Sequence, residues 1–265
     1  MHRSLARRCL LWAGALSLLG ASQMLPRPSD LPPLTEPGLV GSISSTATTT
    51  AADPLEFSAA ELRQLRQRFG VHGPQPRVAQ LFTAGLDQLE PLRARTYTKL
   101  DDLRPIVLRE SRRQGVNPML VMAVLFDELQ HAKPGEDHPI AAHSGLFSTL
   151  GPAQLCLGEM VHQGLLKPDA SEPELQAARD KLLDPEFNVT LLVGKFARLS
   201  KELGYPRGRS LMASRTPLEA KHLAVLAYLH NGKLDYPRRV LRYMQDPELH
   251  SMVYGQRKRS TTALI

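Results

Sequence analysis

Apolar residues along most of the chain recur every three or four positions, which is the period of a helix buried on one face. In segment 184–203, the residues that fall on one side are Phe187, Leu191, Leu192, Phe196 and Leu199. No run alternates between apolar and polar residues over the length of a strand, and no internal repeat is present. The pattern therefore predicts an all-α fold.

Capping residues, prolines and glycines set the expected limits of the helices. Helices are expected over residues 58–69, 75–92, 97–114, 117–130, 151–165, 172–183, 184–203, 216–230 and 236–244. The segment 132–150 contains two prolines, two glycines and two histidines, and we expect it to be an irregular loop.

The segment 117–130 differs from the others because it is apolar on every side. Asn117 is a good N-cap, Pro118 suits the first helical position, and eight apolar residues follow them. Such a helix is normally buried, yet it ends in Asp127 and Glu128, where the helix dipole disfavours anions. Because desolvation raises the pKa of a carboxyl group, this position suits a general acid. The alternative is that both acids only mark the point where the helix meets water.

Residues 1–22 have the composition of an export signal, with three arginines before a short apolar stretch and small residues at a cleavage point. We therefore expect an exported protein, periplasmic or secreted. The alternative is an uncleaved segment that anchors the protein to the membrane. Cleavage removes three arginines and no acids, so the formal charge falls from +7 to +4. It also leaves Cys156 as the one cysteine, which excludes an internal disulfide.

The rest of the chain divides by composition. Residues 23–56 are rich in proline, serine and threonine and are expected to form a disordered linker. An N-terminal helical extension is expected over 57–97, the main helical domain over 98–250, and a basic tail over 251–265. The positive charge suits an anionic partner, but the basic residues are spread along helices, so nucleic acid is not indicated.

Three segments follow one another in an order typical of a known enzyme family. Glu128 ends the buried helix, Leu-Gly-Pro-Ala-Gln-Leu occupies 150–155, and Ala-Tyr-Leu-His-Asn-Gly occupies 227–232. Together they resemble the catalytic domain of the lytic transglycosylases in the lysozyme-like superfamily, over residues 100–244. Asp-Pro-Glu-Phe-Asn at 184–188 also resembles the segment that opens the next long helix of that family.

The resemblance implies a peptidoglycan-cleaving enzyme in which Glu128 acts first as acid and then as base. It also implies that Gly151 and Gln154 contact sugar, that Tyr228 hydrogen-bonds Glu128 or the substrate, and that Asn231 lies nearby. A lytic transglycosylase needs a single carboxyl group, because the acetamido group of its substrate assists and the 6-hydroxyl then attacks to give an anhydro sugar. Peptidoglycan glycan strands are therefore the expected partner, with no cofactor and no metal.

The sequence departs from the family pattern at several positions. Leu129 and Leu150 stand where the family usually has serine, Pro152 replaces leucine, and Leu229 and His230 separate the tyrosine and asparagine of the last motif. These departures leave open a non-catalytic protein that binds or scaffolds the cell wall on the same fold.

Two enzyme alternatives depend on acids and histidines that follow the buried helix. Glu136 or Asp137 could supply a second carboxylate, which favours simple hydrolysis by a muramidase. A metal-dependent hydrolase would use Glu128 and His131 as the first ligands, with further ligands from Glu136, Asp137, His138 and His143.

Overall fold

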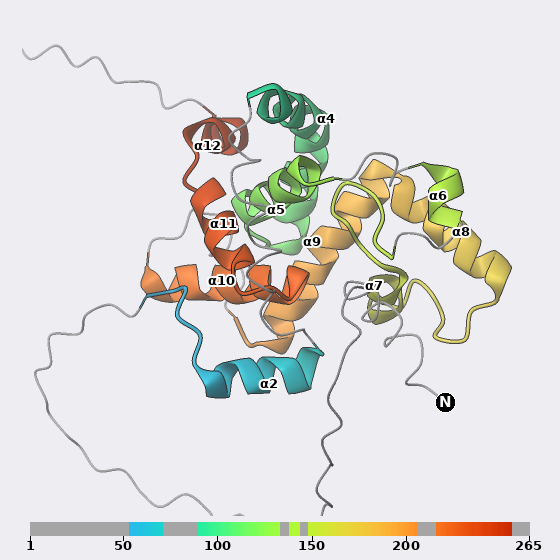
Figure 1. The fold of residues 1–265 in the computed structure, drawn as a ribbon, viewed down its shortest axis with the longest axis horizontal. Coiled ribbons are helices and arrows are strands. Elements are labelled where there is room, and N and C mark those ends of the chain that lie inside the picture. The colour runs from blue at the N-terminus through green and yellow to red at the C-terminus, as the bar shows by residue number, and fades with distance from the viewer. Residues whose placement is uncertain (1–52, 71–89, 133–137, 144–147, 206–215, 256–265) are drawn as a thin grey trace, which may run out of the picture.

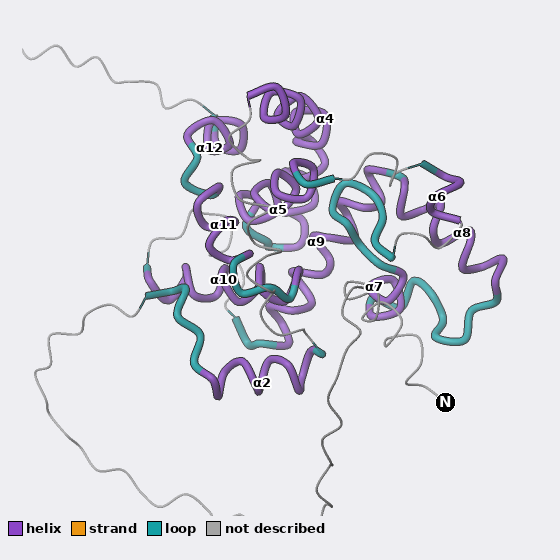
Figure 2. Tube along the Cα trace, in the orientation of Figure 1, coloured by secondary structure: helices purple, strands orange, loops and turns teal. Residues whose placement is uncertain are grey.

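Helices surround one buried helix in the part of the protein that the computed structural model describes, residues 53–70, 90–132, 138–143, 148–205 and 216–255 (Figure 1). They are α2 (Ala59–Phe69), α4 (Glu90–Gln114), α5 (Pro118–Gln130), α6 (Pro139–His143), α7 (Leu157–His162), α8 (Glu172–Leu183), α9 (Pro185–Glu202), α10 (Pro217–Asn231), α11 (Tyr236–Tyr243) and α12 (Pro247–Tyr254). Within these ranges no strand is present (Figure 2). Leu150 and Leu155 form an isolated antiparallel bridge. The predicted all-α class is confirmed.

Helix α5 is the buried helix. The Asn117 side chain accepts hydrogen bonds from the backbone N–H groups of Met119 at 2.8 Å and Leu120 at 3.3 Å, as expected for an N-cap. Every residue from Met119 to Phe126 has 0% exposure. Helices α4, α10, α11 and α12 pack against α5 and cover its sides. Its C-terminal turn then carries Asp127 and Glu128 to the edge of the core.

Helix α9 is a long helix that crosses the molecule next to α4 and α8 (Figure 1). Asp184 caps it by accepting a hydrogen bond from the backbone N–H of Phe187 at 2.7 Å. Leu192 and Phe196 are fully buried on its inner side. The apolar spacing predicted for this segment therefore corresponds to the face that α9 turns toward the core.

Helix α2 of the N-terminal extension lies below α10 in Figure 1 and is joined to it by side-chain contacts. The Phe57 ring, just before α2, is 5.5 Å from the ring of Tyr228 between centroids. The Lys221 ammonium lies 3.7 Å from the centroid of the Phe57 ring and 3.1 Å from a carboxylate oxygen of Glu61. The extension is thus joined to the C-terminal half by contacts between segments far apart in the sequence.

Several helix limits differ from those expected. α4 runs without a break through Tyr97, so the helix start expected there is wrong, and the domain boundary placed at 97 falls inside α4. The helix expected over 151–165 is shorter and begins at Leu157, because a turn occupies 151–154.

Two additional helices lie where no helix was expected. α6 lies within the loop expected over 132–150, and α12 follows the last expected helix and ends inside the expected tail. The signal segment, nearly all of the linker, residues 75–89 of the second helix and the tail beyond 255 lie outside the described residues. None of the helices described has both the length and the hydropathy that a membrane span requires.

Candidate active site

Glu128 lies at the edge of the core with its side chain 12% exposed. The Tyr236 hydroxyl donates a hydrogen bond of 2.8 Å to its Oε1 atom. His230 Nε2 lies 3.3 Å from the same oxygen. Among the described residues, no hydrogen bond is made to Oε2. One carboxyl oxygen is therefore fixed by two groups, while the other has no protein partner within this part of the chain.

Both of these partners of Glu128 are buried, and burial sets their protonation. Tyr236 is 0% exposed, and burial together with the negative charge of Glu128 raises the pKa of its hydroxyl well above the ordinary value. The His230 side chain is 2% exposed, and burial lowers the pKa of this imidazole. The ammonium of Lys195 lowers the pKa of His230 further, whereas Glu128 acts in the opposite direction. Tyr236 thus keeps its proton, and His230 favours the neutral form.

Asp127 precedes Glu128 but faces a different partner. Arg239 on α11 binds it with two hydrogen bonds, Nε to Oδ1 at 2.8 Å and Nη2 to Oδ2 at 3.1 Å. Burial acts to raise the pKa of Asp127, but the hydrogen bonds from His131 and Arg239 outweigh burial and hold that pKa below its ordinary value. Asp127 is therefore an ionised structural acid, and it is not placed to serve as a second catalytic carboxylate.

The Asp127–Arg239 pair also explains how Tyr236 reaches Glu128. Tyr236 and Arg239 are three residues apart on α11, so they share one face of that helix. Farther along α11, the ring of Tyr243 lies 4.8 Å from the ring of Phe126 between centroids. These contacts fix α11 against α5 and bring the phenol to the carboxyl group.

The segment 150–155 forms a turn that Asn188 of α9 holds in place. The fully buried Asn188 accepts a hydrogen bond from the backbone N–H of Ala153 at 2.8 Å. Its amide nitrogen donates to the carbonyl oxygens of Leu150 at 2.9 Å and Leu182 at 2.8 Å. Gly151 has φ +73°, and a Cβ atom there would lie 2.3 Å from the Leu182 carbonyl oxygen. Gly151 is thus required by the packing of this turn.

Gln154 uses both ends of its side chain within the same turn. It has a φ of 47°, and its amide nitrogen donates to the Gly151 carbonyl at 3.1 Å. Its amide oxygen accepts from the Thr149 hydroxyl at 2.7 Å. A sugar contact from Gly151 or Gln154 stays a prediction, because the contacts described are internal to the turn.

The structure gives the hydrogen bond to Glu128 to Tyr236 and not to Tyr228. The other contact expected of Tyr228, with the substrate, stays a prediction. Tyr228 is 0% exposed on α10, and its ring packs on Phe57. It lies two residues before His230 on α10, which is about 200° around the helix, so the two side chains leave opposite sides of it. Tyr236 takes the place expected for Tyr228 because the following helix, α11, supplies the partner of Glu128.

Asn231 is the last residue of α10, directly after His230, and Gly232 closes the helix with φ +81°. Its Oδ1 atom is buried and has no hydrogen-bond partner among the described residues. Asn231 therefore follows directly on His230, which contacts Glu128. The contact of Asn231 with substrate stays a prediction.

The histidines of the metal alternative make other contacts. The Nδ1 atom of His131 lies 2.8 Å from the Asp127 carbonyl oxygen and 3.6 Å from a carboxylate oxygen of the same residue. His143 Nε2 lies 2.6 Å from Oδ1 of Asp180. In the described ranges no three His, Cys, Asp or Glu side chains converge as metal ligands would. Glu136 and Asp137 lie outside these ranges.

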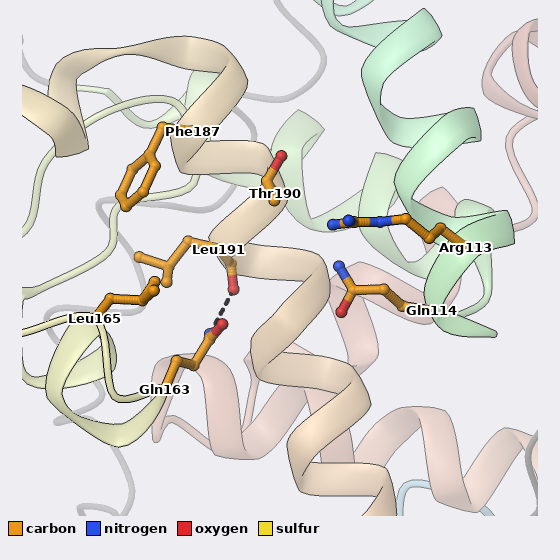
Figure 3. Close-up of a pocket in the computed structure, with 7 residues that line it drawn as sticks. All are labelled: Arg113, Gln114, Gln163, Leu165, Phe187, Thr190 and Leu191. Atoms are coloured by element: carbon orange, nitrogen blue, oxygen red, sulfur yellow. Dashed lines mark hydrogen bonds between the residues drawn. The ribbon is translucent and has the colours of Figure 1, made fainter.

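A cavity of about 480 Å³ lies between the end of α4, α7 and α9 (Figure 3). Arg113 and Gln114 lie on one side of α9, with Gln163 and Leu165 on the other, and Gln163 donates a 2.8 Å hydrogen bond to the Leu191 carbonyl. The full lining is Arg113, Gln114, Gln163, Leu165, Phe187, Thr190 and Leu191. None of the predicted site residues lines this cavity, so it gives no support to their roles.

Sequence reasoning missed His230, Tyr236 and Lys195. His230 lies within the motif 227–232, where it counted only as a departure from the family pattern. The signal that could have identified it is a titratable residue in the last turn of an otherwise apolar helix. No spacing rule identifies Tyr236, because its position depends on the packing of α11 against α5.

Comparisons of the chain with protein-family models, with curated proteins and with solved structures found no match. The functional interpretation therefore depends on the contacts around Glu128 and on the order of the motifs. These two lines are independent, since the contacts of Tyr236 and His230 took no part in the motif argument.

Proposed function

We propose that this protein is a lytic transglycosylase that cleaves the glycan strands of peptidoglycan, with Glu128 as its general acid and base. The observation that supports this most is the asymmetric setting of the Glu128 carboxyl group. Oε1 accepts from Tyr236 and lies beside His230 Nε2, while Oε2 has no partner among the described residues. Such an arrangement holds the group rigidly and leaves one oxygen for proton transfer.

The arrangement suits both protonation states that the reaction needs. In the acid form, the proton resides on Oε2 and is donated to the bridging glycosidic oxygen. In this form, the carbonyl oxygen Oε1 accepts the hydrogen bond from Tyr236 and lies next to His230 Nε2. After the transfer, the same two groups stabilise the carboxylate, which then takes the proton from the attacking 6-hydroxyl of the sugar.

The lytic outcome is proposed because Asp127, the acid next to Glu128 in the described part of the chain, is already paired. Asp127 is 2% exposed and held by Arg239, so it cannot act across the sugar from Glu128. A retaining or inverting hydrolase needs a second carboxylate on the opposite side of the bond. The lysozyme-like fold, the export of the protein and its localisation in the periplasm or medium belong to the same proposal.

Mass spectrometry of digested peptidoglycan tests this function. We expect the purified protein to release fragments that end in an anhydro sugar. Fragments with reducing ends alone would identify a muramidase instead. Sedimentation of the protein with intact peptidoglycan without any release of fragments would contradict the enzyme proposal and favour the wall-binding alternative. Release that stops when a chelator is added would favour the metal-dependent hydrolase.

Replacing Tyr236 by phenylalanine removes one donor to Glu128 while the ring and its packing are retained. We expect kcat to fall by about 10- to 100-fold, because a hydrogen bond to a charged group contributes roughly 1.5–3 kcal/mol. The matched control is Tyr228→Phe, since Tyr228 is equally buried but packs on Phe57. Kinetics on soluble glycan fragments compare the two variants. Equal losses in both, or a loss only in Tyr228→Phe, would contradict the role given to Tyr236.

A further inference from the structure

His230 lies between Glu128 and Lys195 of α9. The Lys195 ammonium is 3.3 Å from His230 Nδ1 and 3.2 Å from the His230 carbonyl oxygen. The other ring nitrogen of His230 lies 3.3 Å from Glu128 Oε1. The imidazole is thus placed between a cation and a carboxyl group, with one ring nitrogen facing each.

The chemistry of these groups determines which ring nitrogen carries the proton. A lysine ammonium has three donors and no acceptor. His230 Nδ1 must therefore accept from Lys195, and the neutral ring then carries its proton on Nε2, directed at Glu128. The reverse tautomer would set an N–H group against the ammonium.

The other groups around the ring fit this assignment. Tyr236 of α11 lies with its ring 5.9 Å from that of His230, and its hydroxyl is bonded to Glu128. The charge of Glu159 on α7 acts to raise the pKa of His230, against burial and Lys195, which lower it. Burial lowers the pKa of Lys195 from its ordinary value, and the charges of Glu159 and Glu128 oppose this lowering without cancelling it.

We propose that Lys195 is a positioning residue, which keeps His230 neutral with its proton on Nε2 and so presents Glu128 with an uncharged donor. Without the cation, His230 gains a proton more readily, since a buried carboxyl group lies on its other side. An imidazolium beside Glu128 would hold that group as the carboxylate, which cannot act as an acid. This catalytic consequence rests on the proposed function, whereas the state of His230 does not.

Nitrogen-15 NMR of the full chain with labelled histidine measures the state of His230 directly, and His230→Asn identifies its signals. At neutral pH we expect an unprotonated Nδ1 and a protonated Nε2 in the unaltered protein. In Lys195→Met, we expect the His230 titration to move to higher pH, and in Lys195→Arg to stay near that of the unaltered protein. Lys201→Met, an exposed position on the same helix, is the control without effect.

The same spectra can overturn the proposal. A proton on Nδ1 of His230 in the unaltered protein would contradict it, and this measurement does not depend on the folding of any variant. A His230 titration that is the same in Lys195→Met and in the unaltered protein would do so as well.

Activity provides the second readout. In Lys195→Met, we expect kcat/KM at pH 5 to fall by about tenfold relative to the unaltered protein, with little change at pH 8, because the acid limb moves with His230. Equal losses at both pH values would indicate a merely structural lysine and would overturn the positioning role. If the unaltered protein cleaves no glycan, the proposed function fails, while the NMR result still decides the role of Lys195.

Discussion

Glu128→Gln is expected to lower the rate of glycan cleavage by about 10³-fold or more, which is the scale of a general acid and base. The amide cannot give up a proton as a carboxylic acid does. Its carbonyl oxygen still accepts from the Tyr236 hydroxyl and still faces His230 Nε2, so both contacts around Oε1 are retained. The loss of rate should therefore come without a loss of fold.

Release of soluble fragments from purified peptidoglycan measures this effect, and thermal unfolding checks that the variant is folded. Glu186→Gln is the matched control, because Glu186 is 62% exposed and makes one surface ion pair with Arg109. We expect both variants to unfold near the temperature of the unaltered protein. Cleavage by Glu128→Gln at the rate of Glu186→Gln would rule out Glu128 as the acid.

Gly151→Ala is expected to lower the free energy of unfolding by about 3 kcal/mol or more. The left-handed backbone at φ +73° costs a residue with a Cβ atom about 1–2 kcal/mol. The new Cβ atom would also lie 2.3 Å from the Leu182 carbonyl oxygen and 2.4 Å from the Asn188 amide nitrogen. Overpacking of this kind typically adds about 1–3 kcal/mol. Urea denaturation followed by circular dichroism measures the loss.

Gly164→Ala separates the two contributions. Gly164 has a similar φ of +71°, but a Cβ atom there would meet no heavy atom of the described structure within 4 Å. We expect this variant to lose only the backbone contribution, about 1–2 kcal/mol. Equal losses at Gly151 and Gly164 would show that the close approach of Gly151 to α8 and α9 does not exist in solution.

The variants at Glu128 and Gly151 test the first and the second of the three sequence motifs. Glu128→Gln tests whether the end of α5 is catalytic, and Gly151→Ala tests why the glycine of the second motif is there. Close packing against Asn188 is enough to explain why residue 151 is glycine, without any contact with sugar. The second motif would then position the start of α7 and would not itself contact the substrate.

The sequence predicted helix limits correctly where they depend on residues close together in the chain. Asn117 and Pro118 set the start of α5, and the Asp184 cap set the start of α9, because a cap bonds backbone groups two or three residues away. The unbroken apolar run after Pro118 likewise predicted a fully buried helix. The limit at Tyr97 failed because no glycine or proline interrupts the chain there, so α4 continues. The limit before Leu157 failed because Gly151 and Gln154 adopt left-handed backbone and form a turn.

The sequence by itself determined that this protein is all-α and that Glu128 ends a buried helix, because apolar period and helix caps are properties of neighbouring residues. Only the tertiary structure decided which groups surround that carboxyl group. Tyr236, His230 and Lys195 come from three other helices, and no short-range rule relates their positions to residue 128. Tyr228 and Tyr236 are both buried tyrosines of the C-terminal half, and the packing of α11 on α5 through Asp127 and Arg239 placed the second of them at the site.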